Sequence, residues 1–176
     1  MRKKIYNKGF TLIELMTAVS IFIVIMTVSM GSILSIFDAN RKSRSLKTVM
    51  NNLNLALESM SREMRYGRSY NCGTDSDPNC SGGTLMSFTS SDGASISYRF
   101  SNNSIEKRTG TGSYVMVTAP EIVIDDMTFY TIGALTTDTL QPKVLIKIKS
   151  HAGSGVGRSD FTLQTLVSQR RLDRNP

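Results

Sequence analysis

Apolar residues form an almost unbroken run near the start of the chain. The 28 residues from Phe10 to Phe37 include a single charged side chain, Glu14. An α-helix rises about 1.5 Å per residue, so a helix over this stretch would be ~42 Å long, which exceeds the ~30 Å hydrocarbon core of a bilayer. The pattern therefore predicts a helix over residues 10–37 that is long enough to cross a membrane.

A second, amphipathic pattern follows over residues 38–67. Its apolar residues recur every three or four positions, which is the spacing of one face of an α-helix. A coiled coil is the alternative interpretation, but the stripe spans fewer than three full heptads. We expect the helix to end at Gly67 and the stripe to form the spine on which a sheet packs. The stripe consists of Leu46, Met50, Leu53, Leu57, Met60 and Met64.

Beyond the helix, the pattern changes to short alternating segments separated by turn residues. Residues 70–83 are rich in Asn, Asp and Gly and predict a loop. After this loop, apolar and polar residues alternate, as is typical of strands. A long helix followed by consecutive short strands predicts an α+β fold, in which the helix packs on an antiparallel β-sheet. The predicted strands are Thr84–Ser90, Ala94–Ser101, Ser104–Thr109, Tyr114–Thr118, Ile122–Ile132, Lys143–Ser150 and Phe161–Gln169.

The positive charge of the chain is concentrated at one end. The formal net charge is +7 and the isoelectric point is about 9.6, a value that would suggest nucleic-acid binding. Four of these charges precede Phe10, however, and the rest of the chain carries only +3. Near the C-terminus Arg170, Arg171 and Arg174 form a small cluster, but Asp173 interrupts it and no aromatic residue accompanies it. The sequence therefore does not favour nucleic acid as a partner.

Two other kinds of N-terminal apolar segment fit these residues less well. A cleaved secretory signal has an apolar region of about 7–15 residues that ends at small residues, whereas this one continues to Phe37. A lipoprotein signal requires a cysteine directly after the apolar stretch, and the first cysteine here is Cys72. Four basic residues flank the stretch on each side, so charge does not determine its orientation.

Glu14 is the unusual residue of the apolar stretch. A carboxylate near the bilayer centre costs about 2.5–3.5 kcal/mol, so such a residue usually has a function. The structural alternative is that Glu14 lies close enough to the helix end for its side chain to reach the lipid headgroups. The neighbouring residues favour a functional role, and they read Lys8-Gly9-Phe10-Thr11-Leu12-Ile13-Glu14-Leu15.

This segment resembles the N-terminal signature of type IV pilins and of the pseudopilins of type II secretion. In that family a prepilin peptidase cuts a short basic leader after a glycine, and the new N-terminal residue, usually phenylalanine, is N-methylated. The resemblance implies cleavage between Gly9 and Phe10, methylation of Phe10, and a role for Glu14 in assembly. Many family members have a proline within this helix, where the chain has Gly31.

The resemblance also implies a pilin-like fold with four segments. These are a basic leader (1–9), a transmembrane or filament-core helix (10–37), its amphipathic continuation (38–67) and a β-rich extracytoplasmic head (68–176). The implied partners are a prepilin peptidase, other pilin or pseudopilin subunits, the inner-membrane assembly platform, and membrane lipid before assembly. The protein would cross the cytoplasmic membrane once and then enter a pilus or pseudopilus.

Two weaker resemblances favour a minor subunit over the main shaft protein. The segments Met60–Arg65 and Phe161–Arg171 resemble parts of the J-type minor pseudopilins and related minor pilins. The favoured hypothesis is therefore a structural subunit that acts at the tip or at initiation. The alternative is a tip-located binding module that captures DNA, a surface or a secreted substrate. A third hypothesis, a membrane protein that is never processed, is separated from both by cleavage after Gly9.

The two cysteines are predicted to form a disulfide if the head is exported. Seven residues separate Cys72 from Cys80, and oxidising compartments favour a bond between them. Two free thiols are the alternative. Asp75 and Asp77 lie between the cysteines with the spacing of the start of a calcium loop, but the later ligands of that pattern are missing. We expect a solvated turn there.

The residues offer little catalytic or metal-binding chemistry. His151 is the only histidine, so a His-rich zinc site cannot form, and the sequence identifies no partners for a Ser-His-Asp triad. The glycine-rich segment 153–157 lacks the GK[ST] ending of a phosphate loop and leads into a predicted strand. The sequence therefore predicts no enzyme activity, no catalytic residues, no metal site and no cofactor.

Overall fold

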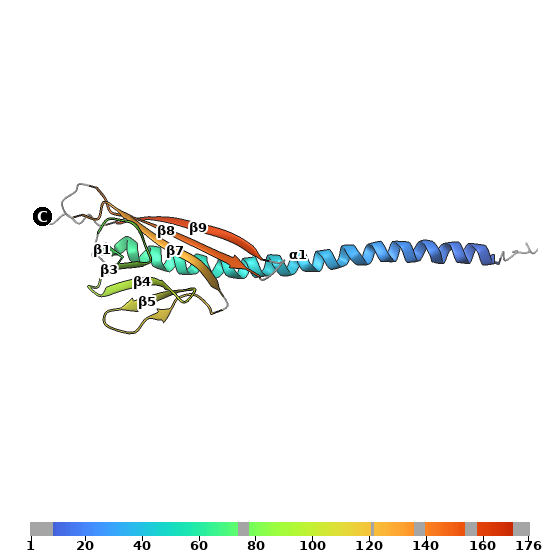
Figure 1. Cartoon of the computed structure of the whole chain (residues 1–176), viewed down its shortest axis with the longest axis horizontal. Coiled ribbons are helices and arrows are strands. Elements are labelled where there is room, and N and C mark those ends of the chain that lie inside the picture. The colour runs from blue at the N-terminus through green and yellow to red at the C-terminus, as the bar shows by residue number, and fades with distance from the viewer. Residues whose placement is uncertain (1–8, 74–77, 121, 136–139, 154–157, 171–176) are drawn as a thin grey trace, which may run out of the picture. The chain divides into compact units, whose positions relative to one another are not determined.

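The computed structural model describes residues 9–73, 78–120, 122–135, 140–153 and 158–170. The leader before Gly9, the segment that contains Asp75 and Asp77, residues 154–157 of the glycine-rich segment and the residues after Arg170 lie outside this description. The chain divides into two compact units, Met1–Arg41 and Lys42–Pro176, here called the N-terminal unit and the C-terminal unit. The long helix α1 (Leu12–Tyr66) contributes residues to both (Figure 1).

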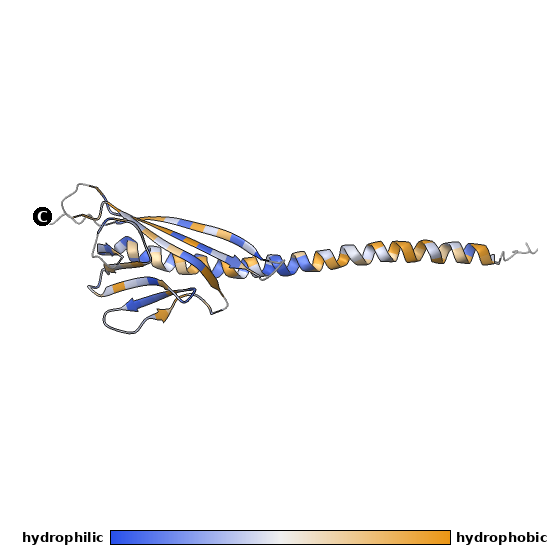
Figure 2. Cartoon of the chain, viewed as in Figure 1, coloured by the Kyte–Doolittle hydropathy of each residue, from blue (hydrophilic) through white to orange (hydrophobic). Residues whose placement is uncertain are grey.

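In the N-terminal unit, α1 is apolar on all sides. Every described residue of this unit is exposed, and the helix contains one candidate membrane span with a mean hydropathy of 2.3. Figure 2 shows this part of α1 as largely hydrophobic. A helix that is hydrophobic all round is typical of a buried or membrane-spanning segment rather than of a surface helix. Among the described residues of this unit, 9–41, none covers the apolar surface of the helix.

In the C-terminal unit, α1 has a buried face and an exposed face. The predicted stripe is largely correct: Leu53, Met60 and Met64 have no exposed surface, although Met50 is exposed and Val49 takes its place in the core. On the opposite face, Glu58 and Arg62 form an exposed ion pair one turn apart. This part of α1 is the spine of the unit, as the sequence predicts.

Two antiparallel sheets pack with α1 around a common core (Figure 1). One sheet has the order β1-β3-β4-β5-β6 and the other the order β2-β7-β8-β9. Alternate residues of both sheets face the core, and among them Phe88, Tyr98, Phe129 and Ile146 are almost completely buried. The strands are β1 (Arg68–Cys72), β2 (Cys80–Gly83), β3 (Leu85–Thr89), β4 (Ser95–Ser101), β5 (Ser104–Thr109), β6 (Val115–Met116), β7 (Val123–Ile132), β8 (Lys143–Ala152) and β9 (Ser159–Ser168).

The α+β prediction is confirmed, and each of the seven predicted strands is present. An Asn-Asn pair forms the turn between β4 and β5, and both Asn102 and Asn103 have positive φ (49° and 56°). Two residues with positive φ form the hairpin turn whose twist matches that of the flanking strands. Asparagine tolerates this conformation better than most residues, so the pair fixes the register of the hairpin.

The prediction of a loop over residues 70–83 is wrong at its two ends. β1 and β2 occupy those ends and pair with β3 and β7, respectively. The short alternation of Tyr70 and Cys72, both buried, was the only signal of β1. The turn residues that surround this segment hide the alternation in the sequence. Ser69, with a positive φ of 54°, lies where the register between β1 and β3 shifts.

The helix ends at Tyr66, next to the predicted Gly67, but for a different reason. A glycine that ends a helix often does so by adopting a positive φ, but here the residue with positive φ is Ser69. A Cβ atom at Gly67 would lie 2.5 Å from a ring carbon of Phe88, so close packing requires the glycine. The Tyr70 hydroxyl donates to the carbonyl of Gly67 at 3.2 Å, which satisfies one of the last carbonyl groups after the helix.

Candidate functional site

The N-terminal candidate site begins where α1 begins. Thr11 precedes the first helical residue, and its Oγ1 accepts a hydrogen bond from the backbone N–H of Glu14 at 3.3 Å. This contact is an N-cap, which satisfies one of the free donors at the start of a helix. Glu14 lies in the first turn of α1, where the helix dipole favours a negative charge. Gly9 and Phe10 thus lie directly before the helix, and Glu14 lies in its first turn.

Hydroxyl groups in the apolar part of α1 form hydrogen bonds with carbonyl groups of the same helix. The hydroxyl groups of Ser20 and Thr27 each donate to the carbonyl four residues earlier at 2.8 Å, and that of Ser35 does so at 3.1 Å. Such bonds remove the cost of placing a hydroxyl group in hydrocarbon. None of the ion pairs among the described residues involves Glu14. Its carboxylate is therefore the polar group of this segment that most needs a partner from outside.

The side chain of Phe10 is 83% exposed, and Gly9 before it is also exposed. The peptide bond between them precedes the helix and is accessible within the described residues. An exposed peptide bond outside regular secondary structure is the form in which a peptidase can act on it. Cleavage there would leave a free amino group on Phe10, four residues before Glu14.

The two cysteines form a disulfide in the C-terminal unit. Cys72 ends β1 and Cys80 begins β2, and their Cα atoms are 5.8 Å apart. Because β1 belongs to one sheet and β2 to the other, the bond links the two sheets covalently. A Cβ atom at Gly83 would lie 2.9 Å from Cys72 Sγ, so a glycine is needed beside the bond. The disulfide therefore holds the two sheets together at the edge of the core.

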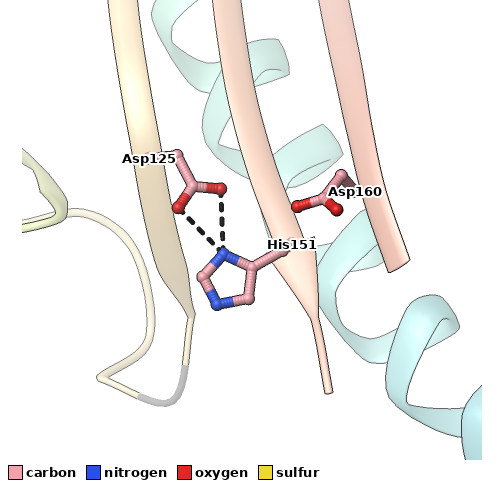
Figure 3. A group of neighbouring side chains, drawn as sticks. All are labelled: Asp125, His151 and Asp160. Carbon is pink, nitrogen blue, oxygen red and sulfur yellow. Dashed lines mark hydrogen bonds and ion pairs between the residues drawn. The ribbon is translucent and has the colours of Figure 1, made fainter. Parts of the chain in front are cut away.

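A cluster of polar residues lies at one end of the four-stranded sheet (Figure 3). Asp125, on β7, occupies the position where the register of β7 and β8 shifts, and its carboxylate lies 2.8 Å from His151 Nδ1. Asp160, on β9, is the cross-strand partner of His151. One ligand atom from each of the three residues lies within 4.8 Å of the others. In spacing alone, the cluster could hold a divalent cation.

Arg158 already compensates the charge of this cluster. Its guanidinium group donates to Asp160 at 2.7 Å and lies 3.7 Å from the Asp125 carboxylate. The hydrogen bond from Arg158 lowers the pKa of the Asp160 carboxyl group below its ordinary value. A metal ion would have to displace the guanidinium group, so the ion-pair network explains the cluster without a metal.

A second group combines basic and aromatic side chains on the five-stranded sheet. The guanidinium carbons of Arg99 and Arg108 lie 3.7 and 4.8 Å from the centre of the Tyr114 ring. Glu106 accepts a hydrogen bond from Arg99 Nε at 2.7 Å. Arg108 Nε is buried and has no hydrogen-bond partner among the described residues. Arg99 is thus paired with a carboxylate, while the Nε–H group of Arg108 donates no hydrogen bond among the described residues.

Neither the cluster around His151 nor the group around Tyr114 could be recognised from the sequence. Their members are distant in the sequence and come together through strand pairing. Asp125 and His151, for example, meet only in the observed register of β7 and β8. A shift of one residue would place either side chain on the opposite face of the sheet. Neither the hydrophobic pattern nor a motif of fixed spacing carries that information.

Comparison with protein families identifies the N-terminal segment. Residues 5–30 match the family model described as the prokaryotic N-terminal methylation motif. The match supports a relationship to type IV pilins and pseudopilins, and it covers the segment that contains Gly9, Phe10 and Glu14. Together with the apolar helix, it indicates a membrane-anchored, pilin-type subunit. No curated protein and no solved structure matched the chain.

Proposed function

We propose that this protein is a structural subunit of a type IV pilus or of a type II secretion pseudopilus. It is made as a membrane-anchored precursor, cleaved between Gly9 and Phe10 by a prepilin peptidase, and N-methylated on Phe10. The observation that carries the proposal is the methylation motif over residues 5–30, followed by an apolar helix with an N-cap at Thr11. The helix anchors the precursor in lipid and then enters the core of the filament.

In this proposal Glu14 sets the position of one subunit against the next. Cleavage creates a cationic amino group on Phe10, and Glu14 of a neighbouring subunit pairs with it. An unpaired carboxylate is costly in hydrocarbon and a paired one is less so. The pair therefore selects one longitudinal register of the helices over the others. The assembly platform of the inner membrane and the other pilin-type subunits are the partners in this step.

We further propose a minor role at the tip or at initiation. The resemblance of Met60–Arg65 and Phe161–Arg171 to J-type minor subunits supports it. The size of the head supports it as well, since residues 68–176 form a large body for a subunit that would repeat along a closely packed shaft. A minor subunit needs to be present only in a few copies at the end of the filament.

Purified filaments test this role directly. We expect the chain to be present but scarce relative to the main pilin, and we expect its deletion to abolish or sharply reduce filaments. A matched strain lacking only the main pilin is the control for loss of the shaft itself. If this chain is the most abundant protein of the filament, it is the shaft subunit and the minor role is wrong.

A second candidate function is that of a tip-located binding module. The group formed by Arg99, Arg108 and Tyr114 supports it, because a basic and aromatic surface suits anionic ligands. Binding of single-stranded DNA to the C-terminal unit tests this function at two salt concentrations. Arg108→Gln should weaken binding, whereas Lys143→Gln, an exposed charge on the other sheet, should leave it unchanged. Equal effects would indicate attraction by net charge alone.

A further inference from the structure

The solvent-facing side of the four-stranded sheet has an apolar row that crosses three strands. Tyr130 on β7 pairs with Leu145 on β8, which in turn pairs with Leu166 on β9. Val144 and Ile146, the neighbours of Leu145 along β8, face the core, so the row lies on the opposite, outer face. Leu166 is 62% exposed, and Tyr130 and Leu145 are partly exposed. The row is therefore an apolar strip on a face that water reaches.

The outer face next to this apolar row is polar. The adjacent row consists of Thr128, Lys147 and Gln164, and the row beyond it contains Lys149 and Thr162. A sheet with one solvated face normally places polar side chains on that face. Single exposed apolar residues are common on protein surfaces, whereas a contiguous group of them marks an interaction site. The apolar row thus indicates contact with another molecule.

Two lysines flank the apolar row, one on each side of Leu145. Lys143 and Lys147 lie two residues before and two residues after Leu145 on β8, so the three side chains share the outer face. Among the described residues, neither lysine forms an ion pair. Lys149, on the same face but farther from the row, lies 3.7 Å from the Asp126 carboxylate. Within the described part of the unit, the charges beside the apolar row are thus the ones without compensation.

Charge complementarity indicates what this face binds. Cations on both sides of apolar side chains attract a surface that has carboxylates around an apolar centre. A face-to-face contact with a second copy would bring the same lysines together, which is unfavourable for like charges. A bilayer surface requires apolar side chains that reach the acyl region, whereas Tyr130 and Leu145 are partly buried in the sheet. The face therefore suits an acidic segment of a protein.

We propose that the outer face of β7, β8 and β9 binds an extended acidic segment of another protein. An apolar side chain of that segment covers Leu145 and Leu166, and one carboxylate contacts each of the two flanking lysines. Residues four apart on a strand are separated by about 13 Å, so the partner's carboxylates are four residues apart as well. The contact lies within the C-terminal unit and does not depend on cleavage after Gly9. Its failure would therefore leave the proposed function unchanged.

Methyl NMR with two synthetic peptides tests the proposal on the full chain in phosphatidylcholine nanodiscs. The acidic probe is Ser-Glu-Ser-Leu-Ser-Glu-Ser, and the basic probe has lysine in place of both glutamates. We expect the acidic probe to shift the methyl signals of Leu145 and Leu166, with an affinity at least about tenfold higher than that of the basic probe. The signals of Leu53 and Leu57, which are buried in the core, should not shift. No shift, or equal affinities for the two probes, would overturn the proposal.

Two neutralising variants on β8 are the matched controls. Lys147→Gln should weaken binding of the acidic probe several-fold, whereas Lys149→Gln, which removes the same charge from the same face, should leave it unchanged. An equal loss in both variants would indicate attraction by net charge alone and would overturn the proposal. Exchange of phosphatidylcholine for phosphatidylglycerol should not shift the Leu166 signals in the absence of peptide. A shift in that case would assign the face to anionic lipid and would also overturn the proposal.

Photo-crosslinking in cells provides a second test. A photoreactive amino acid replaces Leu166, and in a matched control it replaces Thr162, which is exposed on the same face of β9 but outside the apolar row. We expect only the Leu166 position to form an adduct with another protein, and the crosslinked peptide should contain two acidic residues four positions apart. An adduct with a second copy or with lipid, a crosslinked peptide without acidic residues, or no adduct at Leu166 would overturn the proposal.

Discussion

The two parts of α1 illustrate two ways of stabilising one continuous helix. In residues 12–41, every side chain is exposed and most are apolar. In residues 42–66, apolar side chains such as Leu53 and Met60 are buried by the sheets, and polar residues cover the opposite face. The backbone hydrogen bonds of the helix follow the same pattern in both parts. The parts differ in what covers their apolar side chains: the sheets cover those of residues 42–66, whereas none of the described residues covers those of residues 12–41.

The comparison indicates which part of the chain depends on its surroundings. Burial of a large apolar side chain contributes about 1.5–3 kcal/mol to the free energy of folding. In the C-terminal unit, the sheets of the unit itself bury the apolar face of α1. The apolar part of α1 can obtain such burial only from lipid or from other helices. The C-terminal unit should therefore fold without a membrane, whereas residues 12–41 should need an apolar environment such as a bilayer.

The largest expected effects come from placing a carboxylate in each part of the helix. Met60→Asp buries a charge in the core and should destabilise the C-terminal unit by about 4 kcal/mol or more, because the group has no partner there. Val24→Asp should leave the melting of that unit unchanged, while membrane insertion becomes less favourable by about 3 kcal/mol. Thermal denaturation of the C-terminal unit and membrane fractionation measure the two effects.

Asn54→Asp is the matched control for these substitutions, because Asn54 lies on the exposed face of α1 in the C-terminal unit. It should change neither melting nor insertion by more than about 0.5 kcal/mol. If Val24→Asp lowers the melting temperature as much as Met60→Asp does, the two parts of the helix are not independent and the comparison is wrong.

Loss of the disulfide should affect the C-terminal unit alone. The bond between Cys72 and Cys80 closes a short ring and should contribute about 2–3 kcal/mol to stability. The double variant Cys72→Ser, Cys80→Ser should therefore melt at a lower temperature and still insert into membranes. Alkylation of exported protein without reductant checks the bond itself. Labelling of both cysteines in the folded protein would show that the bond does not form in the cell.

Glu14→Leu should affect the apolar part alone. The substitution removes the charge that opposes insertion, so processing should persist and membrane insertion should become easier. Incorporation into filaments should fall about tenfold, equivalent to ~1.4 kcal/mol, because the amino group of a neighbouring Phe10 loses its partner. A tip subunit has few neighbours above it, which would reduce the effect. Quantitative immunoblotting of filaments measures the loss, with Asp38→Leu as the control outside the apolar stretch.

The smallest expected effect concerns the contact between α1 and β4. The Tyr98 hydroxyl donates to Glu63 at 2.8 Å, and burial, followed by the charge of Glu63, raises the pKa of Tyr98 above its ordinary value of 10. Its contribution is complete below pH 10 and is lost at higher pH, where the unfolded chain ionises first. Tyr98→Phe should cost about 1 kcal/mol at pH 7.

Denaturation curves between pH 8 and pH 11 provide the check. The wild type should lose stability as the pH rises through about 10, whereas Tyr98→Phe should lose less over the same interval. An identical pH dependence in both proteins would mean that the hydroxyl is not buried against Glu63. Membrane insertion should be unaffected in either case.

The helix and the N-terminal methylation motif could be recognised in the sequence because both depend on local spacing. The period of Leu53, Leu57, Met60 and Met64 identifies a helix face without any knowledge of the sheet. The cleavage motif is likewise contiguous. The strands after residue 83 follow from their alternation, although β6 is shorter than predicted because only Val115 and Met116 pair with β5.

The remaining features depend on contacts that local spacing does not determine. Tyr70 belongs to a strand because the residues after it, Asn71 and Cys72, pair with β3, and Gly67 is required because Phe88 packs against it. The cluster of Asp125, His151 and Asp160 needs a register shift in β7, which no local pattern indicates. Pairing between distant segments decides these features.

The intact mass of the mature protein is the most direct test of the central claim, that this chain is a processed pilin-type subunit. The protein is purified from membranes of cells that contain the peptidase. The account predicts the loss of residues 1–9 and the gain of one methyl group on Phe10, with Gly9→Val as a variant that should keep the full-length mass. Detection of only the full-length, unmethylated chain in cells with an active peptidase would contradict the account.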